Sequence, residues 1–423
     1  MARKMKDSGI EWIGEIPEGW EVIKAKYLFS PRNEKGNSTL VLLSPTQKYG
    51  VIPQSQLEGV VQVKENTDLQ SFKTIHYGDF VISLRSFQGG FEFSNYEGVC
   101  SPAYQVFHAT KDLSNDFFRY LFKSDGFISK INSLTVGIRE GKNIQYWDFS
   151  NMLLALPPKK VQIRSAQYLN AKCIEIDTML SKTRSSIEEY KKLKQAVITQ
   201  AVTKGVRGER EMKDSGVEWI GEIPEEWNKC KLKNISIGIG DGLHGTPKFD
   251  DSGEVYFING NNFSSEYVEP KFDTKKLCLE ESLNYPKPEL TEQTIMISLN
   301  GSYGKVCLYR YFPMLLGKSA GYITLLPSIN RRYVRYYLSS TPAQIIMTLS
   351  LNGTTIPNLS LNTLYNFPTI LPPASEQAEI ADYLDAKCAE IDKLIAKKEQ
   401  LVKELESYKK SLIYEVVTGK GEV

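Results

Sequence analysis

Two short stretches contain the glycine and lysine residues of a phosphate-binding loop, but neither has the complete pattern. Residues 301–305 (GSYGK) lack the Ser or Thr that would follow the lysine and bind Mg²⁺. Residues 316–319 (LGKS) have that serine, but Phe312 occupies the position of the leading glycine. Neither stretch opens a long helix, so we interpret both as turns rather than as nucleotide sites.

Other catalytic patterns are also incomplete. The sequence has no GxGxxG after a strand and no GxSxG elbow. The double prolines at 157–158 and 372–373 follow Leu, not the Asp or Asn with which an amino-methyltransferase holds its target amine. His76, His108 and His244 are scattered, and the six cysteines form no CxxC pair. We therefore expect no catalytic residue, metal or cofactor on this chain and place catalysis on a partner.

The clearest pattern in the chain is an internal repeat. Residues 5–20 read MKDSGIEWIGEIPEGW and residues 212–227 read MKDSGVEWIGEIPEEW, with 14 of 16 positions identical. A second pair, 156–177 and 371–392, has 13 of 22 positions identical. The chain therefore consists of two half-copies in tandem. The segments between the matched blocks differ, which indicates one kind of task performed on two different targets.

Each half-copy ends in a segment that predicts a long helix. Residues 159–203 contain no Gly or Pro, and the same pattern follows the second double proline. The double prolines predict the helix starts, and Gly205 and Gly419 predict the ends. Apolar residues recur at steps of three and four, as in a coiled coil. The predicted seam consists of Ile176, Leu180, Ile187, Tyr190 and Val197 in the first helix and Ile391, Leu394, Val402, Leu405, Tyr408 and Leu412 in the second.

Charge supports pairing of the two helices. Residues 159–205 contain ten basic and four acidic side chains, whereas residues 374–421 contain eight basic and ten acidic ones. The inserts at 20–155 and 227–370 combine short β-type runs, dense turn signals and one helical stretch each. We predict an α+β protein in which two globular domains are separated by an antiparallel coiled coil, with pseudo-twofold symmetry from the repeat. The predicted segments are 1–155, 156–205, 206–370 and 371–423.

Composition is that of an ordinary soluble protein of 423 residues with a net charge of +2. No apolar run has the length of a membrane span, and the N-terminus lacks the apolar stretch of a signal peptide. We expect a cytoplasmic protein without a membrane partner.

Taken together, the frame and inserts resemble the specificity subunit of type I restriction-modification systems. The frame motifs are the opener SGxEWIGEIPxxW, the helix start LPPxxxQ, CxEID, the YKK segments at 190–192 and 408–410, and a closing VTKG or VTGKG. The insert motifs are GDFVISLRSFQGG (78–90), GVCSPAYQVF (98–107), DGLHGTPKFDDSG (241–253) and SLNGSYGKV (298–306). One departure is the first helix start, which reads KKVQIR where the second has Glu376-Gln377.

This resemblance implies a non-catalytic subunit in which each insert reads one half of a bipartite DNA site. The helices would set the spacing and dock two methyltransferase subunits, which methylate adenine with S-adenosylmethionine. Two restriction subunits with ATP and Mg²⁺ could add to the complex. Two alternatives remain open: a bipartite DNA-binding scaffold outside restriction, and a coiled-coil scaffold whose inserts bind protein.

Base reading requires polar side chains on exposed loops, with Arg suited to guanine and Asn or Gln to adenine. On that ground we select candidate DNA contacts in both inserts. Those of the first insert are Arg85, Ser86, Gln88, Tyr104, Arg139 and Lys142, and those of the second are His244, Thr246, Lys248, Asn261, Asn262, Ser302, Tyr303 and Lys305.

Overall fold

The chain forms two compact units, each of which combines parts of both half-copies. The computed structural model describes residues 3–37, 39–57, 69–84, 86–134, 144–351 and 357–423. Unit 1 comprises Met1–Arg184 with Gln400–Val423, and unit 2 comprises Ser185–Glu399. Each unit therefore holds one opener, one insert, the start of one long helix and the end of the other. The four predicted segments follow the repeat, whereas the compact units divide both long helices.

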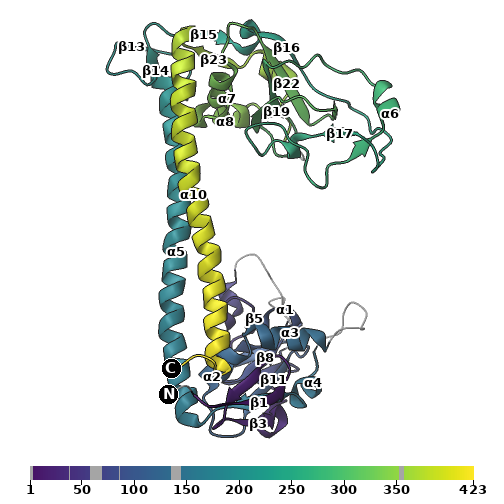
Figure 1. Ribbon diagram of the computed structural model, residues 1–423, viewed down its shortest axis with the longest axis vertical. Coiled ribbons are helices and arrows are strands. Elements are labelled where there is room, and N and C mark those ends of the chain that lie inside the picture. The colour runs from purple at the N-terminus through teal and green to yellow at the C-terminus, as the bar shows by residue number, and fades with distance from the viewer. Residues whose placement is uncertain (1–2, 38, 58–68, 85, 135–143, 352–356) are drawn as a thin grey trace. The chain divides into compact units, whose positions relative to one another are not determined.

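Two long helices occupy the predicted segments (Figure 1). Helix α5 spans Lys159–Lys204, with 46 residues, and α10 spans Ala374–Val417, with 44 residues. Each begins directly after its double proline, where the restricted backbone before proline prevents earlier helix formation. Each ends near a glycine with positive φ, at 81° for Gly205 and 75° for Gly419. These glycines adopt the left-handed conformation that terminates many helices.

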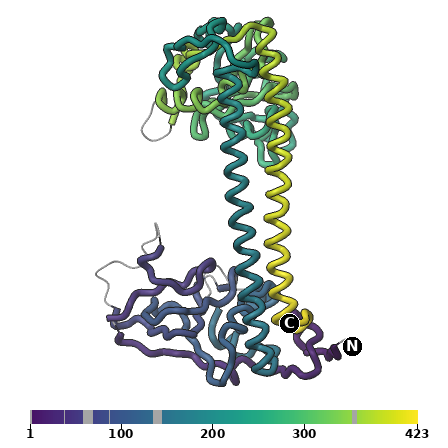
Figure 2. Tube along the Cα trace, turned by 90° about the vertical axis from the view of Figure 1, so that its left-hand side faces the viewer, coloured from purple at the N-terminus to yellow at the C-terminus, as the bar shows by residue number. Residues whose placement is uncertain are grey.

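The two helices run antiparallel within each unit, and Figure 2 shows them side by side. In unit 1, Lys409 Nζ donates to both oxygens of Asp177 at 2.7 Å. In unit 2, Lys194 Nζ donates to Asp392 at 2.6 and 2.7 Å. These pairs are reciprocal, because Asp177 and Asp392 are equivalent in the repeat, as are Lys194 and Lys409. By these contacts, Lys194 is the structural equivalent of Lys409. The two YKK segments, which match in sequence, are therefore not at equivalent positions in the structure.

Burial along the helices largely follows the predicted seam. Ile176, Leu180, Ile187, Ile391 and Leu412 are buried, and Tyr190, Val197, Val402 and Leu405 are partly buried.

Two predicted seam residues in α10 lie outside it. Leu394 and Tyr408 are exposed, whereas their neighbours Ile395 and Lys409 are partly buried. The prediction was wrong at these two positions because a step of three placed them about 100° away from the face that packs on α5. In place of Tyr408, the seam contains Lys409. Its aliphatic stem is partly buried, and its ammonium group reaches Asp177.

Unit 1 contains short strands and helices around one four-stranded antiparallel sheet of order β4-β11-β8-β9. Its elements are β1 Met5–Ile10, β2 Gly14–Pro17, β3 Glu21–Lys24, β4 Phe29–Arg32, β5 Leu43–Thr46, β6 Gly50–Pro53, β7 Lys73–Ile75, β8 Phe80–Ile82, α1 Ser86–Gly89, β9 Glu92–Phe93, β10 Gly98–Cys100, β11 Gln105–Ala109, α2 Asn115–Leu121, α3 Asp125–Ser133, α4 Tyr146–Ser150 and β12 Leu153–Leu156.

Unit 2 repeats this sheet with order β16-β22-β19-β20. Its elements are β13 Met212–Asp214, β14 Glu222–Pro224, β15 Asn228–Lys231, β16 Ser236–Gly240, β17 Val255–Ile258, β18 Lys276–Leu277, α6 Leu279–Leu283, β19 Thr294–Ser298, β20 Val306–Leu308, β21 Met314–Leu316, β22 Ala320–Leu325, α7 Arg331–Ser339, α8 Thr341–Leu349, α9 Leu361–Tyr365 and β23 Pro368–Leu371. The inserts, unlike in sequence, therefore share the topology of this sheet and a following helix pair.

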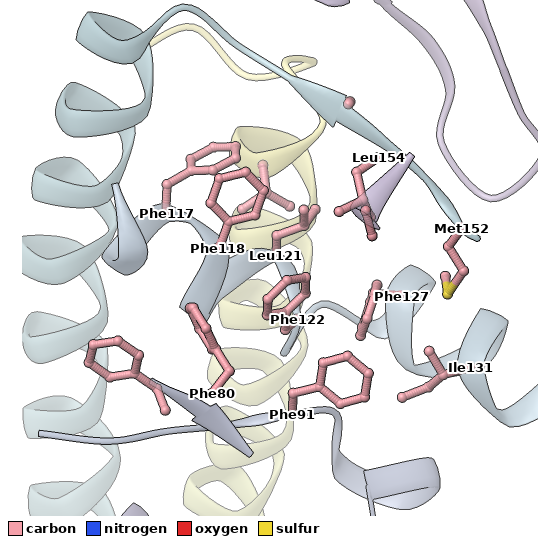
Figure 3. Close-up of a cluster of buried hydrophobic side chains, with 14 of the residues drawn as sticks. Phe80, Phe91, Phe117, Phe118, Leu121, Phe122, Phe127, Ile131, Met152 and Leu154 are labelled. Atoms are coloured by element: carbon pink, nitrogen blue, oxygen red, sulfur yellow. The ribbon is translucent and has the colours of Figure 1, made fainter. Parts of the chain in front are cut away.

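The core of unit 1 contains a cluster of packed phenylalanine rings (Figure 3). Phe80 of β8 lies 5.1 Å from Phe122 between ring centroids, edge to face, and Phe91 packs on Phe127 of α3 in the same way. Edge-to-face contacts place the positive ring edge on the negative face of the neighbour. This core fixes the helix pair α2–α3 against the sheet and so holds the connection between β8 and β9.

A glutamine at each long-helix start ties that helix to its insert. Gln162 accepts from Ser114 N and donates to Pro157 O, at 2.9 and 2.8 Å. Gln377 accepts from Asn330 N and donates to Pro372 O, both at 2.9 Å. Ser114 and Asn330 are the N-caps of α2 and α7. The identical glutamines thus join equivalent elements of the two units.

Candidate nucleic-acid interface

The two inserts place predicted contact residues on the same connection of their shared sheet. The connection from β8 to β9 contains α1 with Ser86 and Gln88, and the connection from β19 to β20 contains Ser302, Tyr303 and Lys305. We call these connections recognition turn 1 (residues 83–91) and recognition turn 2 (residues 299–305). Equivalent positions with unrelated side chains are what two readers of different targets require.

Recognition turn 1 presents Gln88 to solvent and buries Ser86. Ser86 Oγ accepts a 2.8 Å hydrogen bond from Ser83 N, and Gly90 N donates to Ser86 O at 2.8 Å. Ser86 therefore shapes the turn, and we do not retain it as a base-contacting residue. Gln88 keeps the exposed amide that reading adenine would need. Arg85 lies outside the described residues.

The hairpin tip between β5 and β6 lies against this turn. A Cβ atom on Gly89 would come within 2.9 Å of Gln47 Cγ, so glycine allows the close approach. Gln47, Lys48 and Tyr49 are all exposed, and Lys48 Nζ lies 4.8 Å from the Tyr49 ring centroid. Our sequence analysis did not select these three residues, although a polar TQKYG turn between two short apolar strands was a detectable signal.

The remaining candidates of insert 1 do not add to this surface. Tyr104 is partly buried and packs on a small core with Leu43 and Val51, while its carbonyl accepts from Lys73 Nζ at 2.6 Å. This packing gives Tyr104 a structural role. Arg139 and Lys142 lie outside the described residues.

Recognition turn 2 is held by the hydroxyl of Ser298, the last residue of β19. Ser298 Oγ donates to Ser302 O at 2.6 Å and accepts from Lys305 N at 2.9 Å. Gly301 and Gly304 have φ of 69° and 73°, which side chains rarely adopt. The side chains of Ser302 and Lys305 are exposed.

A groove beside recognition turn 2 provides room for a ligand backbone. Its volume is about 810 Å³, and its lining includes Lys305, Ser264, Ser265 and Thr348 together with Gln195 of α5. The hydroxyl of Tyr303 lies 3.3 Å from Thr348 Oγ1. Hydroxyl, amide and ammonium groups are the usual partners of phosphate oxygens, so this groove suits a nucleic-acid strand.

The loop at 241–248 is a second exposed polar segment of unit 2. His244 Nε2 lies 2.6 Å from Asp241 Oδ2, and Lys248 N donates to Glu281 Oε1 at 3.1 Å. The side chains of His244, Thr246 and Lys248 are exposed. Hydrogen bonds to Asp241 and Glu281 thus hold the loop, while three polar side chains remain exposed.

The two adjacent asparagines have different environments. Asn261 is exposed, whereas Asn262 is buried. The Asn262 amide accepts from Asn259 N at 3.0 Å and donates to Thr274 Oγ1 at 2.8 Å. Because these bonds occupy the amide, it has no free edge for a base, and only Asn261 remains a candidate.

Within the ranges that the structure describes, no group of three or more His, Cys, Asp or Glu residues could hold a metal ion. No helix in those ranges has both the length and the apolar character needed to cross a bilayer.

Comparison with known proteins agrees with this architecture. Residues 224–404 match the family model of the type I restriction modification DNA specificity domain. The type I restriction enzyme MjaVIII specificity subunit of Methanocaldococcus jannaschii is 25% identical over 96% of this chain and 93% of its own length.

Solved structures show the same fold. A structure described as the basis of complex assembly and conformational transition of the type I R-M system has a TM-score of 0.72, with 16% identity over 95% of this chain and 98% of its own. The HsdS subunit from Thermoanaerobacter tengcongensis has a TM-score of 0.53, with 16% identity over 96% of this chain and 98% of its own. The family model, the relatives and the fold together support a specificity subunit of a type I restriction-modification system.

Proposed function

We propose that each unit reads one half of a bipartite DNA sequence through its recognition turn and the loops beside it. The observation that carries the proposal is the shared connection, which has the same place in both sheets and different exposed side chains: Gln88 in one, Ser302 and Lys305 in the other. As a specificity subunit, the chain is a recognition subunit and not an enzyme. Its ligand is double-stranded DNA, and it acts in the cytoplasm.

The long helices set the spacing between the half-sites and dock the partners. An α-helix rises 1.5 Å per residue, so a helix of 46 residues is roughly 70 Å long. The frame elements are repeated in the two half-copies, and their openers are nearly identical, which suits docking of two copies of one methyltransferase subunit. That partner binds S-adenosylmethionine and methylates adenine. Two restriction subunits, where present, add ATP- and Mg²⁺-dependent cleavage.

The inserts have few excess positive charges, so the partner must contribute to holding the DNA. Residues 20–155 contain 14 basic and 13 acidic side chains, and residues 227–370 contain 14 and 11. DNA binding by counterion release needs several clustered cations. The isolated chain should therefore bind DNA weakly, and addition of the methyltransferase should tighten binding strongly. Tight binding by the chain alone at 0.2 M salt would contradict this division.

Mapping of methylated adenines tests the function directly. The genome of a host that carries the chain and its methyltransferase is compared with that of a host lacking only the chain. We expect a split motif with a fixed spacer to be methylated in the first and absent from the second. Unchanged methylation would refute the proposal. Methylation of a continuous, unsplit motif would refute the assignment of one half-site to each unit.

A further inference from the structure

Both recognition turns are held in the same way, by a side chain from the helix pair beneath them. In unit 1, Lys123 Nζ, between α2 and α3, donates to Gly89 O at 2.8 Å. In unit 2, Gln344 Nε2, in the first turn of α8, donates to Gly304 O at 2.9 Å. Each carbonyl lies just before the outgoing strand, β9 or β20. The two contacts are therefore equivalent in place, although the side chains differ.

The chemistry of the two contacts is different. Lys123 Nζ also pairs with Glu92 Oε2 at 2.7 Å, and the Glu92 side chain is only 1% exposed. Gln344 is neutral, and its amide also donates to Leu338 O at 2.8 Å. Unit 1 thus uses a buried ion pair where unit 2 uses an amide.

The ion pair is not an efficient way to stabilise the fold. Glu92 Oε1 is buried without a hydrogen-bond partner in the part of the chain that the structure describes. Burial raises the pKa of the Glu92 carboxyl to about 7, against the opposing effect of Lys123. A buried carboxylate with one unsatisfied oxygen costs free energy. This cost is understandable if the pair serves recognition.

We propose that Lys123, supported by Glu92, and Gln344 are positioning residues that hold recognition turns 1 and 2 in their DNA-reading conformations. This inference rests on the proposed function of the two units. Base discrimination depends on side chains held within a fraction of an ångström, and a turn that loses its anchor loses that preorganisation. Lys123 and Gln344 each hold one turn, so each affects base discrimination in one half-site.

The test uses the complete complex with its methyltransferase and DNA carrying single base changes in either half-site. The measured quantity is discrimination, the ratio of methylation rates on the correct and the changed sequence. Lys123→Met should reduce discrimination on the order of tenfold in one half-site and leave the other unchanged, since that is the contribution of one good base contact. Gln344→Leu should do the same in the opposite half-site.

A transplanted anchor separates positioning from general stability. The double variant Lys123→Gln with Glu92→Gln gives unit 1 the neutral device of unit 2, and it should retain discrimination that Lys123→Met loses. Between pH 8 and pH 6, discrimination in the half-site of unit 1 should fall in the unchanged protein, because Glu92 becomes protonated and Lys123, the charged group that acts on it, loses its counter-charge. It should stay constant in the double variant. The half-site of unit 2 is the internal control.

The outcomes distinguish the inference from the function on which it rests. If Lys123→Met affects both half-sites equally, or the double variant is as impaired as Lys123→Met, the positioning role is refuted while split-site methylation stands. If the unchanged complex methylates no split sequence, the proposed function fails and this inference with it. Thermal unfolding and complex assembly are measured for each variant, so a misfolded protein is recognised as such.

Discussion

At the scale of single residues, identical side chains of the two half-copies lie in different surroundings. Trp227 Nε1 donates to Glu376 Oε2 at 2.9 Å, and Arg210 donates to Glu376 Oε1 at 2.6 Å. The equivalent Trp20 Nε1 is buried without a partner among the described residues, because Val161 occupies the position of Glu376. The departure noted at the first helix start therefore has a structural consequence.

Replacement of Glu376 tests how much stability the contacts among Glu376, Arg210 and Trp227 provide. Glu376→Val leaves Arg210, whose side chain is 14% exposed, without its buried partner and should cost about 3 kcal/mol of unfolding free energy. Addition of Arg210→Met should recover most of that loss, since unit 1 already tolerates tryptophan beside valine. Chemical denaturation of the two variants gives the comparison. Equal losses in both would show that the arginine is not the source of the cost.

Glu92 offers a prediction with a defined pH dependence. Its pKa is raised from 4.5 to about 7 in the folded protein, so the native state binds the extra proton between these values. Stability should therefore fall as pH rises through this window and remain lowered above it. Glu92→Gln, which mimics the protonated form, should raise the free energy of unfolding by up to about 3 kcal/mol at pH 8 and leave it unchanged at pH 4. Thermal melts of the variant and the unchanged protein at both values decide, and a Glu92→Gln variant that melts below the unchanged protein at pH 8 would contradict the sign.

At the scale of elements, ion pairs and apolar packing together determine how α5 and α10 contact each other. The reciprocal pairs Asp177–Lys409 and Lys194–Asp392 fix the antiparallel register within each unit. They are partly exposed, so each adds little stability, and their value lies in orientation. Apolar packing supplies most of the free energy.

Two neighbouring positions in α10 provide a matched test of the seam. Ile391 is 6% exposed and Leu394 is 36% exposed. Ile391→Ala should cost about 2–4 kcal/mol by leaving a cavity, whereas Leu394→Ala should change stability by less than about 0.5 kcal/mol. Denaturant titration measures both. A larger loss at Leu394 would restore the seam that the sequence pattern predicted.

At the scale of the whole molecule, the proposed spacing role can be tested by shortening both helices together. Deletion of 183–189 and 397–403 removes one heptad from each, which keeps the apolar face in phase to about 20°. The helices become about 10 Å shorter, or roughly 3 base pairs of DNA at 3.4 Å each. The methylated motif should keep its half-sites and lose about that much spacer. Deletion in one helix alone is the control, because it shifts the seam and should destabilise the protein. An unchanged spacer in the paired deletion would contradict the role of the helices.

Features that depend on local rules and on repetition were predictable from the sequence alone. Helix starts after double prolines and helix ends at glycines follow from residues close together in the chain. The two half-copies follow from repeated blocks, and the class of protein was expected from a resemblance. The exposed candidates Gln88, Ser302 and Lys305 could be selected because polar turn residues between apolar strands are a local signal.

Features that depend on contacts between distant segments became known only from the three-dimensional structure. Ser86 and Asn262 read as turn residues free to bind DNA, but bonds within the fold occupy their side chains. Leu394 and Tyr408 fit an apolar period, but the partner helix selects the adjacent face. The two inserts have no matching sequence but form sheets of the same topology, because different apolar residues can fill equivalent buried strand positions. Lys123 and Gln344 lie more than thirty residues from the turns they hold, so no local pattern could join them.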